Sequence, residues 1–418
     1  MKKTLVKRAK STAKRLLKAL KKPDYRDPEV DRLIRLTAKK AKWSYAKTWK
    51  MMNASKEAFG IPYEHYYKNA FWRVPPVKQE ALYKRSVASA DAARKEKAHT
   101  VECVMKHTGW DRDYTDKMIR EACRRRGCTY KEYLMYRFFE LDEKTQDEVF
   151  LVCDSKKLRA KYDTDKDFLA TLSNKERTNR MFSELVGRPW CVNKDVTYKT
   201  FKKLFSGSSK IFYKPIVGSC GRGASAYDIN AENMEAVYNE LTALPKGLIE
   251  EYVVQHPAIN RLSPSSVNTL RLATVSSPSF PVTPDGKYVD LAYAALRIGG
   301  GTSVVDNFHS GGMVAAVDTE TGTIITDAID MESNIYKTHP VSGETIKGVV
   351  IPFFREAVDA VLRECREKKL TGYLGWDIAI TEKGPVLIEL NSGPGVMLLS
   401  SPHAIEHRGM KYVMDKYL

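Results

Sequence analysis

The stretch from Gly375 to Gly395, GWDIAITEKGPVLIELNSGPG, constrains the fold more than any other part of the chain. It contains two apolar runs, Trp376–Ile380 and Pro385–Leu390, on either side of the turn tetrad Thr381–Gly384. Apolar runs of this length, joined by a short polar turn that ends in glycine, predict a β-hairpin. The sequence therefore predicts two antiparallel strands that lead into the open loop SGPG.

Three residues with oxygen-bearing side chains fall at one end of this hairpin. Asp377 lies near the start of the first strand, and Glu389 and Asn391 lie at the end of the second. Glu389 and Asn391 are two residues apart, so both side chains leave the same face of their strand. Mg²⁺ in proteins is bound by few carboxylates, retained waters and substrate phosphates. The pattern predicts a Mg²⁺ site, and a surface hairpin with polar ends is the alternative.

The length and composition indicate a globular protein of more than one domain. The chain has 418 residues, of which 43% are hydrophobic and 29% are charged, a balance typical of folded proteins. The 69 Lys and Arg exceed the 51 Asp and Glu, giving a formal net charge of +18. This excess favours an anionic partner: a nucleotide, a nucleic acid, an anionic lipid or an acidic glycan. The seven cysteines include no CxxC pair, and reduced thiols in a cytoplasmic protein are the simplest account.

Residues 1–22 form a basic segment with ten Lys and Arg and no acidic residue. Leu5, Ala9, Leu16 and Leu20 recur among these cations at helical spacing. The segment predicts a basic amphipathic helix that lies on an anionic membrane, at its inner face. A solvated basic helix is the alternative. Charges interrupt the apolar residues too often for a signal peptide, and no run approaches the ~18 apolar residues of a membrane span.

Residues 23–150 are predicted to be mainly helical, because apolar residues recur along them at helical spacing. An aromatic cluster lies between Tyr63 and Trp72. We interpret it as core, although aromatics interleaved with basic residues also occur where bases stack. His99 and His107 are interpreted as ordinary surface or core histidines.

Residues 151–260 show a mixed pattern of strands and helices. The expected elements are a short strand at 150–152, a helix that opens at Ser173 with an acid three residues later, a helix at 200–205, a strand at 210–216, a helix at 230–244 and a strand at 247–254.

A glycine-rich loop, VGSCGRGA, directly follows the expected strand at 210–216. Lys214 stands near the end of that strand, and Arg222 lies within the loop. Such a loop can turn its backbone N–H groups toward a phosphate, with the two cations nearby. It is neither a Walker A loop nor a GxGxxG motif. The combination favours a flap that closes over a triphosphate, and a plain glycine turn is the alternative.

Residues 261–418 are expected to add strands at 267–275, at 288–298 and from 314, and an amphipathic helix at 352–369, before the hairpin. Arg271 and Arg297 each lie within an apolar run. A buried guanidinium needs an anionic partner, so each is either a structural ion pair or a contact to a ligand phosphate. The long loop at 299–312 is of a kind that is commonly functional. It contains Asp306, Asn307, His309 and Ser310.

Taken in order, these features resemble the ATP-grasp superfamily. The set is Lys175, Lys214, the 218–223 glycine loop, Glu250-Glu251-Tyr252-Val253, Arg297, Asp377, Glu389 and Asn391. The phrases VNTLRLATV, VDNFHSGGM and GWDIAITEKGPVLIELNSGPG are most similar to the sugar-transfer-associated ATP-grasp proteins of polysaccharide gene clusters. The resemblance covers roughly residues 170–400, and its motifs are specific in combination.

The resemblance implies an α+β protein in which two α+β subdomains, residues 151–260 and 261–418, clamp ATP. A basic helix at 1–22 and a mainly helical region at 23–150 precede them. The implied phosphate contacts are Lys175 and Lys214; the flap is Ser219, Cys220, Gly221, Arg222 and Gly223; the hinge strand beside the adenine is Glu250, Glu251, Tyr252 and Val253; the Mg²⁺ ligands are Asp377, Glu389 and Asn391; and the catalytic candidates are Arg297, which would steady the transferred phosphoryl group, Arg271 and His309.

The implied activity is ATP- and Mg²⁺-dependent ligation of a carboxylate to an amine through an acyl phosphate. The expected substrates are a sugar- or peptide-linked carboxylate and an amine acceptor, in surface polysaccharide biosynthesis at the cytoplasmic face of a membrane. One alternative is an ATP-grasp kinase that phosphorylates a sugar-type hydroxyl. Another is a basic nucleic-acid-binding protein with a non-catalytic nucleotide fold, which a steep salt dependence of DNA or RNA binding would support. The intact Asp/Glu/Asn triad argues against the last.

Overall fold

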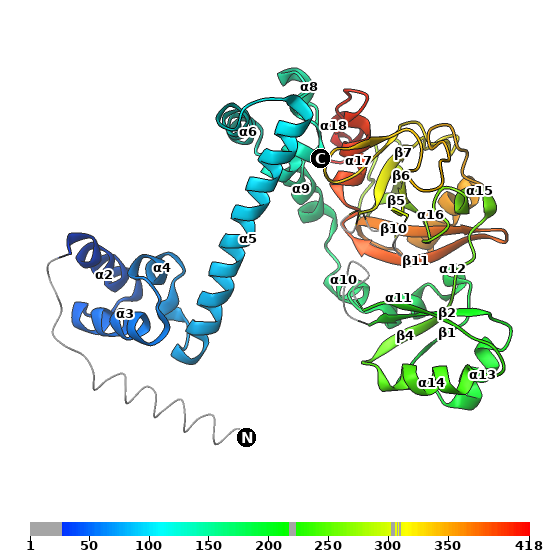
Figure 1. Ribbon diagram of the computed structural model, residues 1–418, viewed down its shortest axis with the longest axis horizontal. Helices are drawn as coiled ribbons and strands as arrows, with labels where there is room; N and C mark the ends of the chain where they lie inside the picture. The colour runs from blue at the N-terminus through cyan, green and yellow to red at the C-terminus, as the bar shows by residue number, and fades with distance from the viewer. Residues whose placement is uncertain (1–26, 217–222, 302–305, 307, 309–310) are drawn as a thin grey trace. The chain divides into compact units, whose positions relative to one another are not determined.

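The computed structural model describes residues 27–216, 223–301, 306, 308 and 311–418. The chain divides into two compact units, Met1–Ala98 and His99–Leu418. Figure 1 shows the elements of both units. The basic segment at 1–22 and most of the predicted flap lie outside the described residues.

All the secondary-structure elements that the structure describes in the first unit are helices. Its elements are α2 (Pro28–Ala41), α3 (Tyr45–Phe59), α4 (Tyr63–Lys68), the 3-10 helix η1 (Phe71–Arg73) and the start of α5 (Pro76–Thr108). Helix α2 begins where the Asp27 carboxylate accepts two backbone N–H groups. Tyr66 and Phe71 are buried in a small core with Ile34 and Met52. The aromatic cluster between Tyr63 and Trp72 is therefore core, as expected.

Charge is divided unevenly between the two units. Residues 1–98 contain 27 Lys and Arg against 9 Asp and Glu, whereas residues 99–418 contain 42 of each. The whole excess of +18 therefore belongs to the first unit. No helix among the described residues is long and apolar enough to cross a membrane.

The second unit begins with a helical region. Its helices after α5 are α6 (Arg112–Arg126), α7 (Tyr130–Met135), α8 (Glu143–Asp147), α9 (Val152–Tyr162), α10 (Lys166–Leu172), α11 (Lys175–Met181) and α12 (Ser183–Val186). The expected strand at 150–152 is wrong. Instead, Leu151 caps α9, because its N–H and that of Val152 donate to the carboxylates of Asp154 and Glu132. The cap of α11 is Asn174, one residue later than expected.

A small antiparallel sheet follows, with the strand order β1-β4-β2-β3. Its strands are β1 (Trp190–Val192), β2 (Lys210–Pro215), β3 (Ser225–Asp228) and β4 (Gly247–Glu251). Helices α13 (Tyr198–Phe205) and α14 (Met234–Ala243) belong to its core, in which Phe201, Phe205 and Leu241 are fully buried. The strand expected at 210–216 and the helix expected at 200–205 are confirmed. The strand expected at 247–254 is present but ends at Glu251, and the helix expected at 230–244 is present but begins at Met234.

A larger antiparallel sheet completes the unit in the described part of the chain, with the order β11-β10-β5-β6-β7-β8-β9. Its strands are β5 (Thr269–Ser276), β6 (Val289–Ile298), β7 (Met313–Val317), β8 (Ala328–Ile329), β9 (Ile335–Tyr336), β10 (Gly372–Thr381) and β11 (Gly384–Ser392); the helices around it are α15 (Pro257–Asn260), α16 (Phe354–Glu367), α17 (Val396–Ala404) and α18 (Lys411–Asp415).

Both faces of the larger sheet are covered, because residues of β5 contribute to two different hydrophobic cores. Leu270 and Leu272 of β5 belong to a core shared with α16, whereas Ala273 and Val275 belong to a core shared with α17 and the helical region. Alternate residues of a strand point to opposite faces, and a bulge between Ala273 and Thr274 interrupts the pairing of β5 with β6. A strand with buried residues on both faces is almost continuously apolar, which is the pattern of VNTLRLATV.

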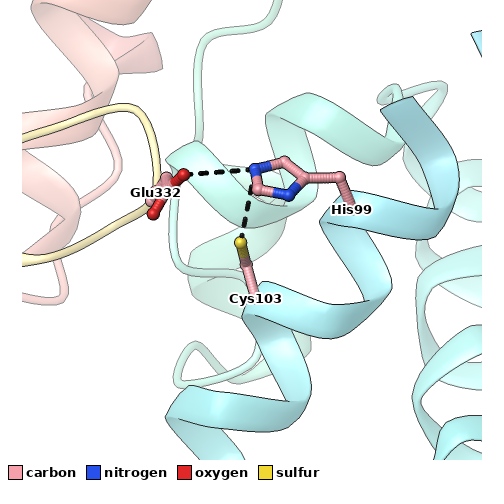
Figure 2. Close-up of side chains that lie close together, drawn as sticks. All are labelled: His99, Cys103 and Glu332. Atoms are coloured by element: carbon pink, nitrogen blue, oxygen red, sulfur yellow. Dashed lines mark hydrogen bonds and ion pairs between the residues drawn. The ribbon is translucent and has the colours of Figure 1, made fainter. Parts of the chain in front are cut away.

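The helical region also contacts the turn between β8 and β9. His99 and Cys103 of α5 lie beside Glu332 in this turn (Figure 2). His107 lies 2.7 Å from the backbone oxygen of Glu332 through its Nε2. Arg137 donates to the backbone oxygen of Ser333 at 2.6 Å. Long-range polar contacts of this kind fix the turn against the helices.

Candidate functional site

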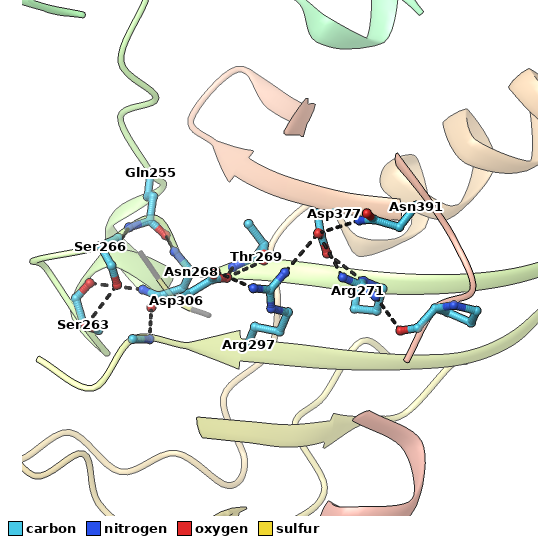
Figure 3. A network of polar contacts seen from close by, with 12 residues as sticks. Gln255, Ser263, Ser266, Asn268, Thr269, Arg271, Arg297, Asp306, Asp377 and Asn391 are labelled. Carbon is cyan, nitrogen blue, oxygen red and sulfur yellow. Dashed lines mark hydrogen bonds and ion pairs between the residues drawn. The ribbon is translucent and has the colours of Figure 1, made fainter. Parts of the chain in front are cut away.

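Asp377 is the centre of a buried network on the larger sheet (Figure 3). Arg271 donates to both carboxylate oxygens, from Nε to Oδ1 at 2.6 Å and from Nη2 to Oδ2 at 2.9 Å. Arg297 donates from Nη1 to Oδ2 at 2.9 Å, and Asn391 donates to the same oxygen at 3.4 Å. The buried Asp377 carboxylate is therefore paired with two guanidinium groups.

The strand registers explain why these residues meet. Asp377 of β10 lies directly opposite Arg271 of β5 and Glu389 of β11. Arg297 of β6 lies opposite Thr269, two residues from Arg271 along β5. Residues two apart share one face of a strand. Four neighbouring strands, β11, β10, β5 and β6, thus present these charged side chains to one face of the sheet. The antiparallel pairing of β10 with β11 confirms the predicted hairpin.

The loop after the hairpin packs closely against β10, and Gly375 permits it. A Cβ atom on Gly375 would lie 2.6 Å from the Cα of Pro394, a distance at which the backbone would have to move. With glycine there, the backbone oxygen of Pro394 comes within hydrogen-bonding reach of Nη1 of Arg271. Arg271 therefore connects the SGPG loop to Asp377.

Arg297 extends the network to the glycine-rich loop. Its Nη2 lies 3.0 Å from Oδ1 of Asp306. The second oxygen of Asp306 accepts the backbone N–H of Thr269 at 2.9 Å and also the Thr269 hydroxyl. Asp306 is buried. Asp306 is thus held to β5 through Thr269 and to β6 through Arg297.

Burial and neighbouring cations have opposite effects on the pKa values of the carboxyl groups in this network. Burial by itself would raise the pKa of Asp377, but the ion pairs with Arg271 and Arg297 outweigh it and lower the pKa. Burial dominates at Asp306 and raises its pKa, although Arg297 opposes the shift. Asp377 is consequently an anion at neutral pH.

Glu389 and Asn391 lie next to Asp377 at the mouth of the network. The Glu389 carboxylate is 37% exposed, and its Oε1 lies 3.3 Å from Nζ of Lys175. Asn391 directs its amide nitrogen toward Asp377, so its amide oxygen remains available. Within the described residues, Oδ1 of Asp377 accepts one hydrogen bond and retains a lone pair. Three hard oxygen donors with spare lone pairs fit Mg²⁺ in chemical kind.

A second charged cluster surrounds Glu250 on β4. Its Oε1 lies 2.9 Å from Nζ of Lys214 and accepts the amide of Asn179 at 2.7 Å, and its Oε2 accepts Nη2 of Arg188 at 2.7 Å. Burial would raise the pKa of Glu250, yet Arg188 and Lys214 lower it to about 2. Burial lowers the pKa of Lys214, and Glu250 opposes that shift. Lys214 is therefore held in place by a carboxylate.

Two cavities lie beside the expected hinge strand. The first has about 570 Å³ of open space, including its mouth, and joins apolar walls to charged groups. It is lined by Arg188, Phe212, Lys214, Glu250, Glu251, Tyr252, Val253, Val267, Thr269, Asp306 and Ile388. The second shares Arg188 and residues 251–253 with the first and continues to the β10–β11 turn. Apolar cavities with a few convergent polar groups are where small ligands commonly bind.

The structure brings many of the predicted site residues together. Arg271, Arg297, Asp377, Glu389 and Asn391 form one cluster, and Lys175 reaches it. Lys214, Glu250, Glu251, Tyr252 and Val253 line the first cavity. Gly223 is described, with a φ of 75°, whereas Ser219, Cys220, Gly221, Arg222 and His309 lie outside the described residues. The roles assigned to all of these residues stay predictions.

Sequence reasoning missed two participants. Arg188 lies between a helix-ending glycine and a proline, where a single arginine has no periodic pattern to mark it. Asn179 lies inside a short helix, and its partner Glu250 is 71 residues away. Both contacts depend on tertiary structure. No pattern in the sequence marked Asn179, whose burial beside Thr178 only the structure shows.

Comparison with known proteins identifies a family model that matches residues 190–411, the model described as sugar-transfer associated ATP-grasp. No curated protein matches the chain. Among solved structures, the ADP complex of purK, an N5-carboxyaminoimidazole ribonucleotide synthetase, is 13% identical with a TM-score of 0.32, covering 55% of this chain and 46% of that one.

Two further solved structures show the same range of similarity. A D-alanine–D-alanine ligase from Bacillus anthracis is 13% identical with a TM-score of 0.31, covering 59% of this chain and 66% of that one. The ligase PsnB with a minimal precursor, Mg and ADP is 12% identical with a TM-score of 0.28, covering 57% and 59%. The chain spans less than two thirds of each of these proteins. The likeness concerns the fold alone.

Proposed function

Because the chain belongs to the sugar-transfer-associated ATP-grasp family, we propose that it is an ATP- and Mg²⁺-dependent ligase that joins a carboxylate to an amine. The family model covers residues 190–411, which hold both sheets. The acid is proposed to be sugar- or peptide-linked, in the biosynthesis of a surface polysaccharide.

One observation carries the proposal: two charged clusters adjoin a single cavity. Asp306 and Lys214 line the cavity, and Asp306 leads through Arg297 to the cluster around Asp377. Lys175 reaches Glu389 in that cluster. A nucleotide in the cavity would have apolar walls for its base and cations for its phosphates. Phosphoryl transfer depends mainly on such positioning and charge stabilisation.

The proposed reaction has two steps. A substrate carboxylate oxygen attacks the γ-phosphorus of ATP, the bond to the β-phosphate oxygen breaks, and ADP leaves with that electron pair. The amine nitrogen then attacks the acyl carbon, phosphate leaves, and the nitrogen loses a proton. Lys175, Lys214 and Arg297 are the cations that we assign to the developing charge on the phosphates. The acyl phosphate is labile in water, so a loop that closes over it would protect it.

Asp377, Glu389 and Asn391 are the residues that would hold Mg²⁺. When bound, the ion would neutralise charge on the phosphate oxygens. Arg271 has a different part in this proposal, because it grips both oxygens of Asp377 and the backbone of Pro394. We assign it to positioning the carboxylate.

Residues 1–22 of the first unit are proposed to bind an anionic surface at the inner face of a membrane. Their ten Lys and Arg and their lack of acidic residues support this assignment, as does the excess of 27 Lys and Arg over 9 Asp and Glu in the whole unit. Residues 99–418, which hold the proposed ligase site, have no net charge, so the cationic excess lies outside the unit that contains that site. A nucleic acid would be attracted by the same charges, so binding to DNA or RNA belongs among the outcomes to be measured.

The test is mass spectrometry of products formed from ATP, Mg²⁺ and a panel of uronic acids and amines. Ligation predicts a new amide together with equal amounts of ADP and phosphate. A phosphorylated hydroxyl without released phosphate would identify a kinase with the same nucleotide site. No ATP consumption with any pair, together with tight, salt-sensitive DNA or RNA binding, would contradict the proposal.

A further inference from the structure

Three potential metal ligands converge where α5 meets the β8–β9 turn. His99 and Cys103 are four residues apart on α5, so they lie on the same side of the helix one turn apart. Glu332 reaches them from the turn, 229 positions after Cys103 in the sequence. Figure 2 shows the same ring nitrogen of His99 facing both the sulfur and the carboxylate.

The distances match neighbouring ligands of one metal ion. Nε2 of His99 lies 3.6 Å from Sγ of Cys103 and 3.2 Å from Oε1 of Glu332. A tetrahedral zinc ion with its usual bond lengths places nitrogen about 3.6 Å from sulfur and about 3.4 Å from oxygen. All three ligand atoms lie within 4.8 Å of one another. A small movement of Glu332 would complete three corners of a tetrahedron.

Hydrogen bonds among the three side chains leave one of the two contacts of Nε2 weak or unfavourable. Nε2 of a histidine carries either one proton or one lone pair. When Nε2 carries a proton, it can donate a hydrogen bond to Glu332 but cannot accept one from the thiol of Cys103. With a lone pair it can accept from the thiol but then faces the Glu332 carboxylate without a proton between them. A cation between the three atoms would satisfy all of them together.

We infer that His99, Cys103 and Glu332 bind a Zn²⁺ ion that links α5 to the β8–β9 turn. Imidazole, thiolate and carboxylate are the three ligand types that zinc takes in proteins. The thiolate excludes Mg²⁺ and Ca²⁺, which select oxygen ligands. The side chains of His99 and Glu332 are 57% and 53% exposed, so solvent reaches the site and a water molecule takes the fourth position.

The turn that carries Glu332 is held in place independently of a metal. The Asp330 carboxylate accepts the backbone N–H of Glu332 at 2.8 Å. Nε2 of His107 contacts the backbone oxygen of the same residue, and Arg137 holds Ser333. The site is therefore largely formed in advance, and this lowers the entropic cost of binding. Zinc would add a cross-link to a contact that exists without it.

The experiment uses the full chain, stripped of metal with a chelator and titrated with Co²⁺ as a spectroscopic substitute for Zn²⁺. We expect a thiolate-to-cobalt charge-transfer absorption that saturates at one ion per chain and disappears when Zn²⁺ is added. Cobalt at the oxygen ligands around Asp377 would produce no such absorption. Zn²⁺ should also raise the melting temperature, since a ligand that binds the native state stabilises it.

Variants assign the absorption to its ligands. Cys103→Ser should abolish it, and His99→Ala or Glu332→Gln should weaken the cobalt affinity about tenfold or more. Cys153→Ser is the matched control, because Cys153 is an exposed cysteine of α9 in the same unit. Because His99 is largely exposed, its variant keeps the test valid if Cys103→Ser misfolds, which circular dichroism would reveal.

Cys123 and Cys128 are the competing thiols, with their sulfurs 3.8 Å apart. The double variant Cys123→Ser/Cys128→Ser should retain the absorption. The inference is overturned if the absorption follows this pair, or if the wild-type chain binds cobalt without any thiolate absorption.

Discussion

Arg271 grips both carboxylate oxygens of Asp377 across the β5–β10 strand pair, at 2.6 and 2.9 Å. Bidentate pairing of this kind is directional as well as strong. It fixes the orientation of a carboxylate that we propose as a metal ligand. The same guanidinium holds the backbone of Pro394, so the SGPG loop and the carboxylate are positioned by one residue.

Removing Arg271 should therefore be costly. Arg271→Ala leaves a buried carboxylate with one of its two guanidinium partners missing, and breaking such a pair costs roughly 3–5 kcal/mol. We expect a fall of this size in the free energy of unfolding measured with urea. Arg271→Lys should recover only part of it, because a lysine cannot form the two parallel hydrogen bonds.

The control for this loss is an exposed ion pair. Lys347 lies 2.8 Å from Glu406, and both side chains are more than 40% exposed. Lys347→Ala should change the free energy of unfolding by less than about 1 kcal/mol. If Arg271→Ala costs no more than Lys347→Ala, the buried network is not the stabilising feature that its geometry indicates.

Glu389→Gln should abolish Mg²⁺-dependent ATP turnover while leaving the fold intact. The substitution removes a ligand charge from a carboxylate that is one third exposed, so the cost to stability is small. The measurement is ADP release at increasing Mg²⁺, together with the melting temperature. Glu356→Gln, an exposed change on α16, should leave both unchanged. ATP consumption by Glu389→Gln at the wild-type rate would refute the assignment of the metal ligands.

Lys214→Ala should weaken ATP binding. Lys214 lines the first cavity, where its ammonium is proposed to meet a phosphate. Isothermal titration calorimetry should show an affinity lower by about tenfold or more, which corresponds to at least one charge-assisted hydrogen bond. Lys203→Ala, an exposed change on α13, is the matched control. Equal affinities of both variants for ATP would make Lys214 only a partner of Glu250.

Glu250 should make the protein sensitive to acid. Its folded-state pKa of about 2 lies below the ordinary value of 4.5. A carboxyl with a lowered pKa stabilises the fold above pH 4.5, and this stability is lost as the pH falls toward 2. The loss amounts to about 3 kcal/mol. We expect the slope of unfolding free energy against pH in this window to become shallower in Glu250→Gln, while Glu232→Gln, an exposed change, keeps the wild-type slope.

Residues 1–22 should mediate binding to anionic lipid. Each Lys or Arg near an anionic surface contributes about 1 kcal/mol, so even half of the ten cations would give measurable adsorption. The full chain should co-sediment with anionic vesicles at low salt and be released as salt rises. Deleting residues 1–22 should remove this binding and leave the ATP-dependent activity. Equal sedimentation of the two forms would mean that the segment is only a solvated arm.

The fold was predictable where local sequence decides local structure. The β10–β11 hairpin follows from its alternating apolar runs and its glycine turn, and the register places Asp377 opposite Glu389 as expected. The strand predicted at 150–152 was wrong, because three apolar residues fit a strand and a buried helix start equally well. There, the carboxylates of Glu132 and Asp154 decide the outcome by accepting backbone N–H groups.

The site was less predictable than the fold. An anionic partner was expected for Arg271, but its identity as Asp377, 106 residues away, depends on which strands become neighbours. Glu250 was expected only as part of the hinge strand beside the adenine, yet its side chain is the centre of an ion cluster with Arg188 and Lys214. His99 was interpreted as ordinary, although Cys103 stands one helical turn away. Only the approach of Glu332 makes that pair significant.

The balance of 42 cations and 42 anions in residues 99–418 has a kinetic consequence. A unit without net charge exerts little long-range force on an anion, so ATP would reach its cavity by ordinary diffusion and be captured only at short range. Salt would then weaken the proposed membrane binding of residues 1–22 without altering the rate of nucleotide capture. A cell could change where such an enzyme resides, through the charge of its lipids, without changing how fast the enzyme is loaded.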